Sequence, residues 1–214
     1  MEPATAETHD TKEQLLRAGE RLFAREGIHR VKLREINAMA GQRNPSALHY
    51  HFGTREGLVM AILGRHNVVI AEAMQQELDR LEAGERITIR DLAAAVVHPL
   101  SGKLDSSSGR AFLQILPQVV PAISASLRRG VMEPTTPQAT RVLELLRERM
   151  TGIPETVLRE RQVAYILMLT GALADRAFQL ESGREMVLDR AQFEAHLLDM
   201  LEAALGAPST VEGT

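Results

Sequence analysis

The apolar residues of this chain recur at the spacing of an α-helix along almost its whole length. Residues 11–26 show the pattern clearly, because Leu15, Ala18 and Leu22 fall on one helical face. The alternation of apolar and polar residues that marks a half-buried strand is almost absent, and glycine or proline interrupts the helical pattern roughly every 15 to 30 residues. The sequence therefore predicts an all-α fold of helices joined by turns.

Short polar residues mark where several of these helices begin. Thr54 is placed to cap one helix, and two pairs, Thr88 with Asp91 and Asp189 with Gln192, have the spacing of capping boxes. The expected helices cover residues 11–26, 33–40, 44–52, 55–82, 88–104, 110–120, 138–150, 155–181 and 189–205.

Three prolines are expected to shape the helices around them. Pro45 suits the first position of a helix capped by Asn44, because its missing N–H costs nothing there. Pro99 should kink its helix, and Pro121 should interrupt the sixth helix before a further helical stretch to residue 129.

Charge is distributed unevenly along the 214 residues. Residues 11–60 hold nine Lys and Arg against five Asp and Glu, so this segment carries +4 and the rest carries −7 of the net −3. A basic module on an acidic body suits a protein that meets DNA with one face, although chance clustering would give the same numbers. The chain has no cysteine, which excludes disulfides and thiolate chemistry.

The ends of the chain and its apolar runs predict no targeting or membrane segment. Residues 1–11 are polar, and the longest apolar-rich run, residues 163–174, is too short to cross a bilayer. We expect a cytoplasmic protein with no membrane partner. Residues 1–10 are expected to form a disordered arm and residues 207–214 a disordered tail.

Residues 33–52 predict two short helices joined by a tight turn at Gly41, the form of a helix-turn-helix DNA reader. A recognition helix must pack one face and present the other to a groove, and Leu48 and Phe52 supply the packed face. The expected DNA contacts are Lys32, Arg34, Arg43, Asn44, Ser46, Ala47, His49, Tyr50, His51 and Arg55.

These residues have different expected partners on the duplex. Asn44 and His49 can hydrogen-bond base edges, and Ala47 can touch a thymine methyl group. Arg43 can reach a guanine or a phosphate. The residues placed for phosphates are Lys32, Arg34, Tyr50, His51 and Arg55. His49 and His51 could instead suggest a metal, but residues two apart project to different sides of a helix. We therefore expect no metal and no cofactor.

Residues 11–63 resemble the DNA-binding domain of the tetracycline-repressor (TetR) family. The resemblance rests on Leu22-Phe23-Ala24-Arg25-Glu26-Gly27, Leu33-Arg34-Glu35-Ile36, Ala40-Gly41 and, most specifically, Leu48-His49-Tyr50-His51-Phe52-Gly53-Thr54-Arg55-Glu56-Gly57-Leu58. It implies a DNA-binding domain over residues 11–54 and a helical effector-binding and dimerisation domain over residues 55–206. It also implies DNA-backbone contacts for Tyr50 and His51 and a phosphate or base contact for Arg34, and Arg55 matches the family's usual lysine.

One departure from the family pattern lies in the turn. Between Gly41 and Leu48 this chain has one residue more than most members, so the turn or the start of the recognition helix must differ.

The resemblance also implies a homodimer through the last two long helices, and the sequence supplies apolar faces for it. Residues 163–174 are apolar nearly all round, and such a helix must be covered on both sides. A plain monomeric core is the alternative. The expected stripe on the last helix consists of Phe193, Leu197, Met200, Leu201, Ala204 and Leu205.

A small-molecule effector is expected to bind among the middle helices, because the family implies a cavity there and pockets combine apolar walls with a few polar groups. The candidate lining residues are His98, Phe112, Leu116, Gln118, Val119, Met168, Asp175 and Phe178.

Together these features predict a ligand-responsive transcriptional regulator, a repressor that a small molecule releases from its double-stranded DNA operator. The alternative is a helical protein-interaction module without DNA binding. An enzyme is not expected, since the sequence offers no nucleophile motif, paired carboxylates or Gly-rich phosphate loop.

Overall fold

A computed structural model describes residues 3–44, 46–129 and 136–211, with side chains from residue 10 onward. All regular structure in these ranges is helical, which confirms the predicted all-α class. The elements are α1 (Pro3–Glu26), α2 (Leu33–Met39), α3 (Ala47–Phe52), α4 (Arg55–Glu82), α5 (Ile89–Ser101), the 3-10 helix η1 (Gly102–Asp105), α6 (Ser107–Arg128), α7 (Pro137–Arg149), α8 (Glu155–Glu181) and α9 (Arg190–Gly206).

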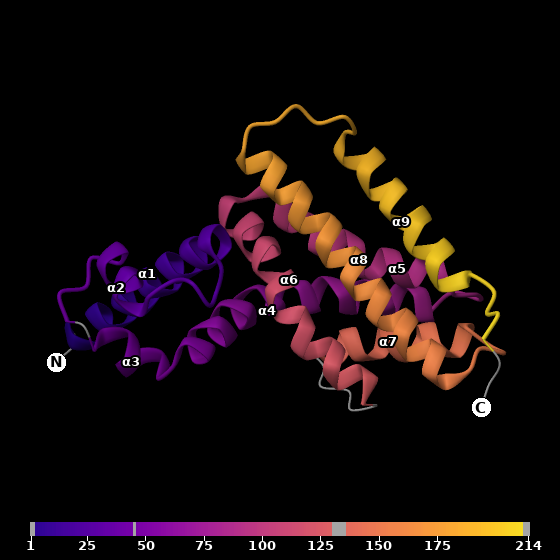
Figure 1. Cartoon of the computed structure of the whole chain (residues 1–214), viewed down its shortest axis with the longest axis horizontal. Helices are drawn as coiled ribbons and strands as arrows, with labels where there is room; N and C mark the ends of the chain where they lie inside the picture. The colour runs from indigo at the N-terminus through magenta and orange to yellow at the C-terminus, as the bar shows by residue number, and fades with distance from the viewer. Residues whose placement is uncertain (1–2, 45, 130–135, 212–214) are drawn as a thin grey trace.

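The molecule has two parts that α4 connects (Figure 1). Helices α1, α2 and α3 form the N-terminal unit at one end, and α4 runs from this unit into a body made of α5 to α9. The N-terminal unit and the first turns of α4 share a core in which Leu15, Phe23, Ile36, Leu48 and Leu58 are fully buried.

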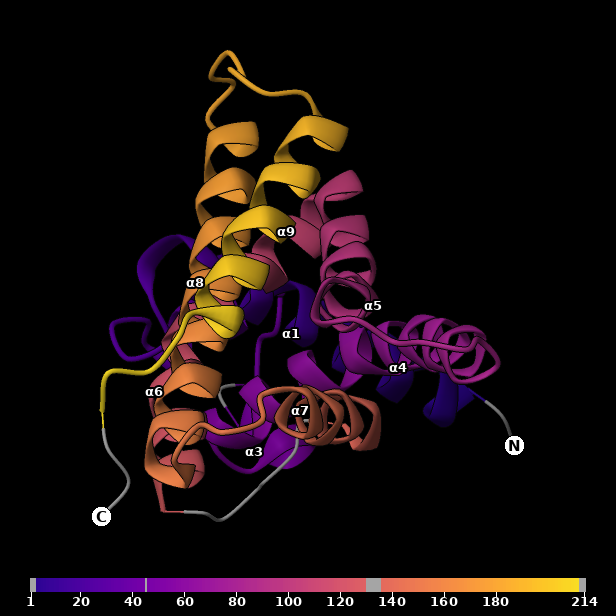
Figure 2. The same ribbon diagram turned by 90° about the vertical axis from the view of Figure 1, so that its right-hand side faces the viewer.

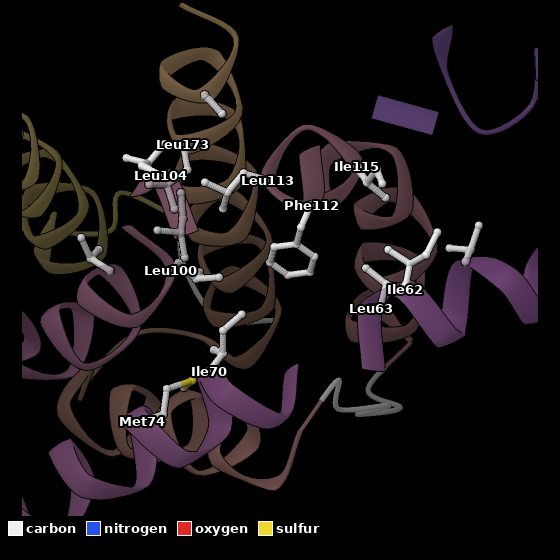
Figure 3. Close-up of a cluster of buried hydrophobic side chains, with 14 of the residues drawn as sticks. Ile62, Leu63, Ile70, Met74, Leu100, Leu104, Phe112, Leu113, Ile115 and Leu173 are labelled. Atoms are coloured by element: carbon white, nitrogen blue, oxygen red, sulfur yellow. The ribbon is translucent and has the colours of Figure 1, made fainter. Parts of the chain in front are cut away.

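In the body, α6 packs along α8, and α9 lies over α5 and α8 (Figures 1 and 2). Helix α6 also packs against α1, so it contacts both parts of the molecule. Phe112 on α6 projects among side chains of α4 and α5, including Leu63, Ile70 and Leu100 (Figure 3).

Most predicted boundaries agree with the structure, and the predicted capping groups explain why. Helices α4 and α8 have the predicted bounds. The Thr54 hydroxyl accepts a hydrogen bond from the Gly57 N–H, and both predicted capping boxes are formed. These contacts depend on residues only three positions apart, so local sequence is sufficient to specify them.

The two ends of the chain were both predicted to be disordered, and the structure describes part of each. Helix α1 begins at Pro3, so the predicted disordered arm is wrong for residues 3–10. Proline is favoured in the first turn of a helix, and no glycine or further proline follows it before Gly19. Residues 207–211 lie beyond the last helix, and residues 1–2 and 212–214 lie outside the described residues.

The prediction that Pro121 interrupts the sixth helix is wrong. Helix α6 continues from Ser107 to Arg128 with both Pro117 and Pro121 inside it. An internal proline costs a helix about 3 kcal/mol, and here α6 packs against both α1 and α8, which offsets that cost. Pro121 also lies on the exposed side of the helix.

Helices α4 and α8 are long and apolar enough to cross a membrane, with mean hydropathies of 1.3 and 1.2 over their most apolar 18 residues. The core helices of a helical body have the same composition. Both helices pack against neighbours in this structure, so their length and composition are weak support for a membrane span.

Candidate nucleic-acid interface and internal cavity

The α2–turn–α3 segment begins with a capped helix and then makes a sharp turn. The Lys32 N–H donates to Glu35 Oε2 at 2.8 Å, which caps α2. After α2 the chain reverses at Gly41, whose φ of 68° lies in the left-handed region that favours glycine. The predicted helix-turn-helix arrangement is therefore formed.

Helix α3 begins at Ala47, three residues later than the predicted start at Asn44. The Asn44 Oδ1 accepts a hydrogen bond from the Ser46 N–H at 2.9 Å, a local contact that competes with helix formation. The residue before a proline is also disfavoured in the helical region. Pro45 itself, predicted at the first helical position, lies outside the described residues.

The two faces of α3 differ in exposure. Leu48 is buried in the core of the N-terminal unit, while Tyr50 on the opposite side is 79% exposed. Ala47 is buried at 7% exposure, so its predicted contact with a thymine methyl group is wrong. Ala47 lies next to Leu48 at the start of α3, and both side chains pack into the core of the N-terminal unit.

His49 on the exposed side of α3 has a defined hydrogen-bonding role. Its Nδ1 lies 2.6 Å from the carbonyl oxygen of Gly53. A carbonyl oxygen only accepts hydrogen bonds, so Nδ1 carries the proton and the neutral ring presents Nε2 as an acceptor. This acceptor suits the exocyclic amino groups of adenine or cytosine in a major groove.

Arg55 at the start of α4 is bonded to the backbone of the N-terminal unit. Its Nη1 donates to the backbone carbonyls of Ile28 and Val31, each at 2.5 Å. These carbonyls lie in the loop between α1 and α2, so Arg55 fixes that loop to the start of α4. Arg55 therefore has a positioning role there, and its predicted contact with a phosphate stays a prediction.

A close backbone approach fixes the orientation of α3 relative to α4. A Cβ atom built on Gly57 would lie 2.1 Å from the carbonyl oxygen of Phe52, so only glycine fits there. The Thr54 hydroxyl bonds the same glycine at its N–H. The end of α3 and the first turn of α4 are therefore held as one rigid corner.

The remaining predicted contact residues lie around this corner. Lys32 and Arg34 are exposed at the start of α2, and Arg43, Asn44 and Ser46 are exposed in the turn. His51 is half-buried, with its ring edge-on to Tyr50 at a centroid distance of 5.1 Å. Apart from Ala47 and Arg55, the predicted residues thus lie on one exposed segment, and their contacts with DNA stay predictions.

Gln118 on α6 is bonded to the N-terminal unit, although the sequence analysis placed it in the effector cavity. Its Oε1 accepts from the Ile28 N–H at 2.7 Å, and its Nε2 donates to the Phe23 carbonyl at 3.1 Å. Both partners lie at the end of α1. Gln118 therefore fastens the body to the unit that carries α3, and its predicted role as a cavity residue is wrong.

A second polar connection joins α1 to the body. Glu20 on α1 is buried, and its Oε1 lies 2.6 Å from His66 Nε2 on α4. The Ser108 hydroxyl at the start of α6 donates to Glu20 Oε2 at 2.6 Å. The His66 ring stacks on Phe112 with a centroid distance of 4.4 Å. A continuous set of contacts therefore leads from Phe112 to α1.

The body contains a cavity of about 140 Å³, partly open to the surface, between α4, α5, α6, α7 and α8. Phe112, Leu116 and Val119 line it, as predicted. Residues from α4, including Leu63, Asn67 and Ile70, form another wall. Phe112 lines the cavity and also stacks on His66. The cavity is therefore in contact with the side chains that lead to α1.

Four other predicted cavity residues lie elsewhere, and those predictions are wrong. His98 and Asp175 are exposed, and Phe178 is 48% exposed beside a surface hollow near α1. Met168 packs against the core without lining the cavity. Helical periodicity placed these residues on apolar helices but could not show which face each helix turns to the cavity.

The polar lining residues were missed by the sequence analysis. They are Asn67, Thr136, Thr140, Tyr165 and Thr170. The signal for Tyr165 was present, since a tyrosine in a run that is apolar nearly all round needs a buried place for its hydroxyl group. Which groups surround that hydroxyl group depends on helices that are distant in the sequence.

The predicted dimer stripe on α9 is only partly available. Leu197, Leu201 and Leu205 are buried within the chain, where α9 packs on α5 and α8. Met200 on α9 and Leu167 on α8 are exposed, at 41% and 49%. A dimer face would therefore use these outer residues, and the inner leucines serve the monomer core.

Within the described ranges, no group of three His, Asp or Glu side chains is arranged to hold a metal ion.

Residues 15–62 match the family model described as bacterial regulatory proteins, tetR family. No curated protein sequence matches the chain. A solved structure of a tetR family transcription regulator from Shewanella sp. PV-4 is 19% identical over 91% of this chain and 97% of that one, with a TM-score of 0.57.

Two further solved structures have the same fold. A TetR-like transcriptional regulator from Rhodococcus sp. RHA1 is 16% identical over 92% of this chain and 97% of its own, with a TM-score of 0.57. SmeT, the repressor of the Stenotrophomonas maltophilia multidrug efflux pump SmeDEF, is 22% identical over 96% of this chain and 99% of its own, with a TM-score of 0.50. At these identities the likeness establishes the fold.

Proposed function

We propose that this chain, whose residues 15–62 match the tetR family of bacterial regulatory proteins, is a DNA-binding transcriptional regulator that reads an operator with α2, the turn and α3. The observation that carries the proposal is the exposed side of α3. Tyr50 is 79% exposed, and His49 presents an acceptor next to it. Exposed Lys32, Arg34 and Arg43 add positive charge for phosphates.

We propose that the regulator acts as a homodimer in the cytoplasm. One recognition helix reads too few base pairs for tight, specific binding, and a two-fold pair reads two half-sites about 34–36 Å apart. The outer faces of α8 and α9, with exposed Leu167 and Met200, are the proposed contact. Residues 55–206 are then the effector-binding and dimerisation domain.

We further propose that a small molecule in the body releases the protein from its operator, so that it acts as a repressor. The cavity wall is connected to α1 through Phe112, His66 and Glu20, and α6 is bonded to the end of α1 through Gln118. A ligand that shifts α4 or α6 would therefore change the angle of the N-terminal unit. An allosteric coupling of about 1–3 kcal/mol lowers operator affinity by about 5- to 150-fold.

The DNA-binding proposal is tested with duplexes selected from a randomised pool by the full-length protein. Fluorescence anisotropy then measures the affinity of variants for a selected duplex. Tyr50→Ala and Arg43→Ala should each weaken binding about 10-fold, because each removes an exposed contact group. Arg128→Ala, in the body and paired with Glu160, is the matched control and should bind like the unchanged protein.

The dependence on salt separates phosphate contacts from base contacts. If Arg43 meets a phosphate, Arg43→Ala should reduce the slope of log affinity against log salt by about 1. Tyr50→Phe keeps the ring and removes only the hydroxyl group. Failure of the unchanged protein to bind any duplex at low salt would contradict the proposal and favour a helical protein-interaction module.

A further inference from the structure

The His49 ring on α3 is held by two hydrogen bonds that join the same pair of residues. The Gly53 N–H donates to the His49 carbonyl at 2.8 Å, and the His49 ring donates from Nδ1 to the Gly53 carbonyl at 2.6 Å. Gly53 ends α3 with a φ of 69°, in the left-handed region that favours glycine. The end of the helix therefore orients this ring before any partner binds.

The bond to Gly53 also selects the ring nitrogen that carries the proton. In a neutral histidine one ring nitrogen is a donor and the other is an acceptor. Because Nδ1 donates to a carbonyl oxygen, Nε2 is left as an acceptor. Among the described residues none bonds to Nε2, and the His49 side chain is exposed. The ring therefore offers a bound molecule one acceptor and no free donor.

This arrangement excludes a phosphate as the partner of the neutral ring. Phosphate oxygens only accept hydrogen bonds and carry negative charge, so they repel the lone pair on Nε2. The exposed cations of the same segment, Lys32, Arg34 and Arg43, have the donors that phosphates require. His49 differs from these cations in the groups that it can bind.

The edges of the bases in the major groove divide into two classes for such an acceptor. Adenine and cytosine each present an amino group there, at N6 and N4, which can donate to Nε2. Guanine and thymine present only acceptors. Next to either of these bases, Nε2 and the base would both lose hydrogen bonds to water without gaining a new one. The ring therefore separates adenine and cytosine from guanine and thymine.

We propose that His49 determines part of the operator sequence, with adenine or cytosine at one position of each half-site donating its amino group to His49 Nε2. The Gly53 carbonyl is the group that positions the ring for this contact. The inference rests on the proposed function and names a chemical feature of its DNA sites. Guanine and thymine are disfavoured at the same position.

The first test needs no DNA. Long-range ¹H–¹⁵N NMR spectra of the full-length protein at mildly alkaline pH, where histidine is neutral, report which nitrogen of each ring is protonated. The signals of His49 are those absent from His49→Phe. We expect the proton on Nδ1. A proton on Nε2 would overturn the proposal, because the ring would then present a donor.

Selection of duplexes from a randomised pool locates the position that His49 reads. The unchanged protein should select adenine or cytosine there, and His49→Phe should lose this preference while the rest of the site stays the same. His49→Arg offers only donors and should change the preference to guanine. His29→Phe, exposed between α1 and α2, is the matched control and should select the unchanged site. The same preference in all four proteins would overturn the proposal.

A duplex that lacks one amino group measures the contact directly. Purine replaces adenine, or pyrimidin-2-one replaces cytosine, at the selected position. The unchanged protein should bind this duplex about 2- to 10-fold more weakly than the original. His49→Phe should bind both duplexes equally, and a general loosening of α3 would not produce this difference between the two proteins.

Two results of these titrations would overturn the proposal. One is an equal loss of affinity in both proteins when the amino group is removed. The other is a slope of log affinity against log salt that falls by about 1 in His49→Phe, as expected for the loss of a phosphate contact.

The two proposals can fail separately. Failure of the unchanged protein to bind any duplex counts against the regulator itself. Binding of a selected duplex with the same base preference in His49→Phe counts against the role of His49 alone.

Discussion

The N-terminal unit and the helical body use the same apolar residue types, but they fill their interiors differently. In the N-terminal unit Phe23, Ile36 and Leu48 are packed with almost no exposure. The body buries Phe112 equally well and still leaves about 140 Å³ of space beside it. The first part is therefore suited to hold a surface in one geometry, and the second to change when a molecule enters.

The two parts also differ in how polar groups are used. Around α3, Arg55 and Thr54 bond backbone groups of neighbouring segments, which fixes the corner between the helices. In the body the buried Tyr165 hydroxyl has no partner among the described residues. Full satisfaction favours rigidity, whereas a buried hydroxyl group without a partner costs stability.

The largest expected effect comes from Leu48→Ala in the N-terminal unit. The side chain is 1% exposed, so its loss should lower the free energy of unfolding by about 3 kcal/mol and weaken duplex binding by loosening α3. Urea denaturation gives the first value. Leu116→Ala is the control in the cavity wall, where the side chain already lacks neighbours on one side and the loss should be smaller. Equal losses would break the comparison.

Enlarging a buried side chain, instead of truncating it, tests the same difference in packing between the two parts. Val31→Leu adds a methylene group to the filled core of the N-terminal unit and should cost about 1–3 kcal/mol. Val142→Leu makes the identical change beside the cavity, where the added group has room, and should be neutral or stabilising. Thermal unfolding of the two variants measures the contrast. A destabilising Val142→Leu would show that the cavity walls cannot accept added volume.

The smallest effect is expected at the connection between the parts. Gln118→Leu leaves the Ile28 N–H without its acceptor and should cost about 1 kcal/mol. Gln118→Glu keeps the acceptor for Ile28 but places a second oxygen against the Phe23 carbonyl, so its stability loss should be similar and only the exchange rate at Ile28 separates the two variants. Hydrogen exchange at the Ile28 amide should speed up in the leucine variant only. If exchange is equally slow in both, Gln118 does not hold the end of α1.

Much of the fold could be predicted from local sequence. The bounds of α4 and α8 and the caps at Thr54, Thr88 and Asp189 depend on residues within a few positions. The prediction failed at Pro121, where packing against two other helices outweighs an unfavourable local residue. It also failed at the start of α3, where the Asn44 side chain takes the Ser46 N–H.

The functional residues divide in a similar way. The exposed side of α3 could be predicted, because Leu48 and Tyr50 fall on opposite sides of a short helix. The correct roles of Arg55 and Gln118 could not, since their partners lie 24 to 95 positions away in the chain. Of the predicted cavity residues, Phe112, Leu116 and Val119 were correct and the exposed His98 was wrong.

The sequence by itself determined the helical class, most helix boundaries and the basic segment that precedes an acidic body. Each of these depends on periodicity, capping or composition, which act over a few residues. Only the tertiary structure decided that a cavity exists, that Tyr165 faces it and that Gln118 joins the two parts. These features require helices distant in the sequence to pack together, and packing across such distances depends on the whole chain.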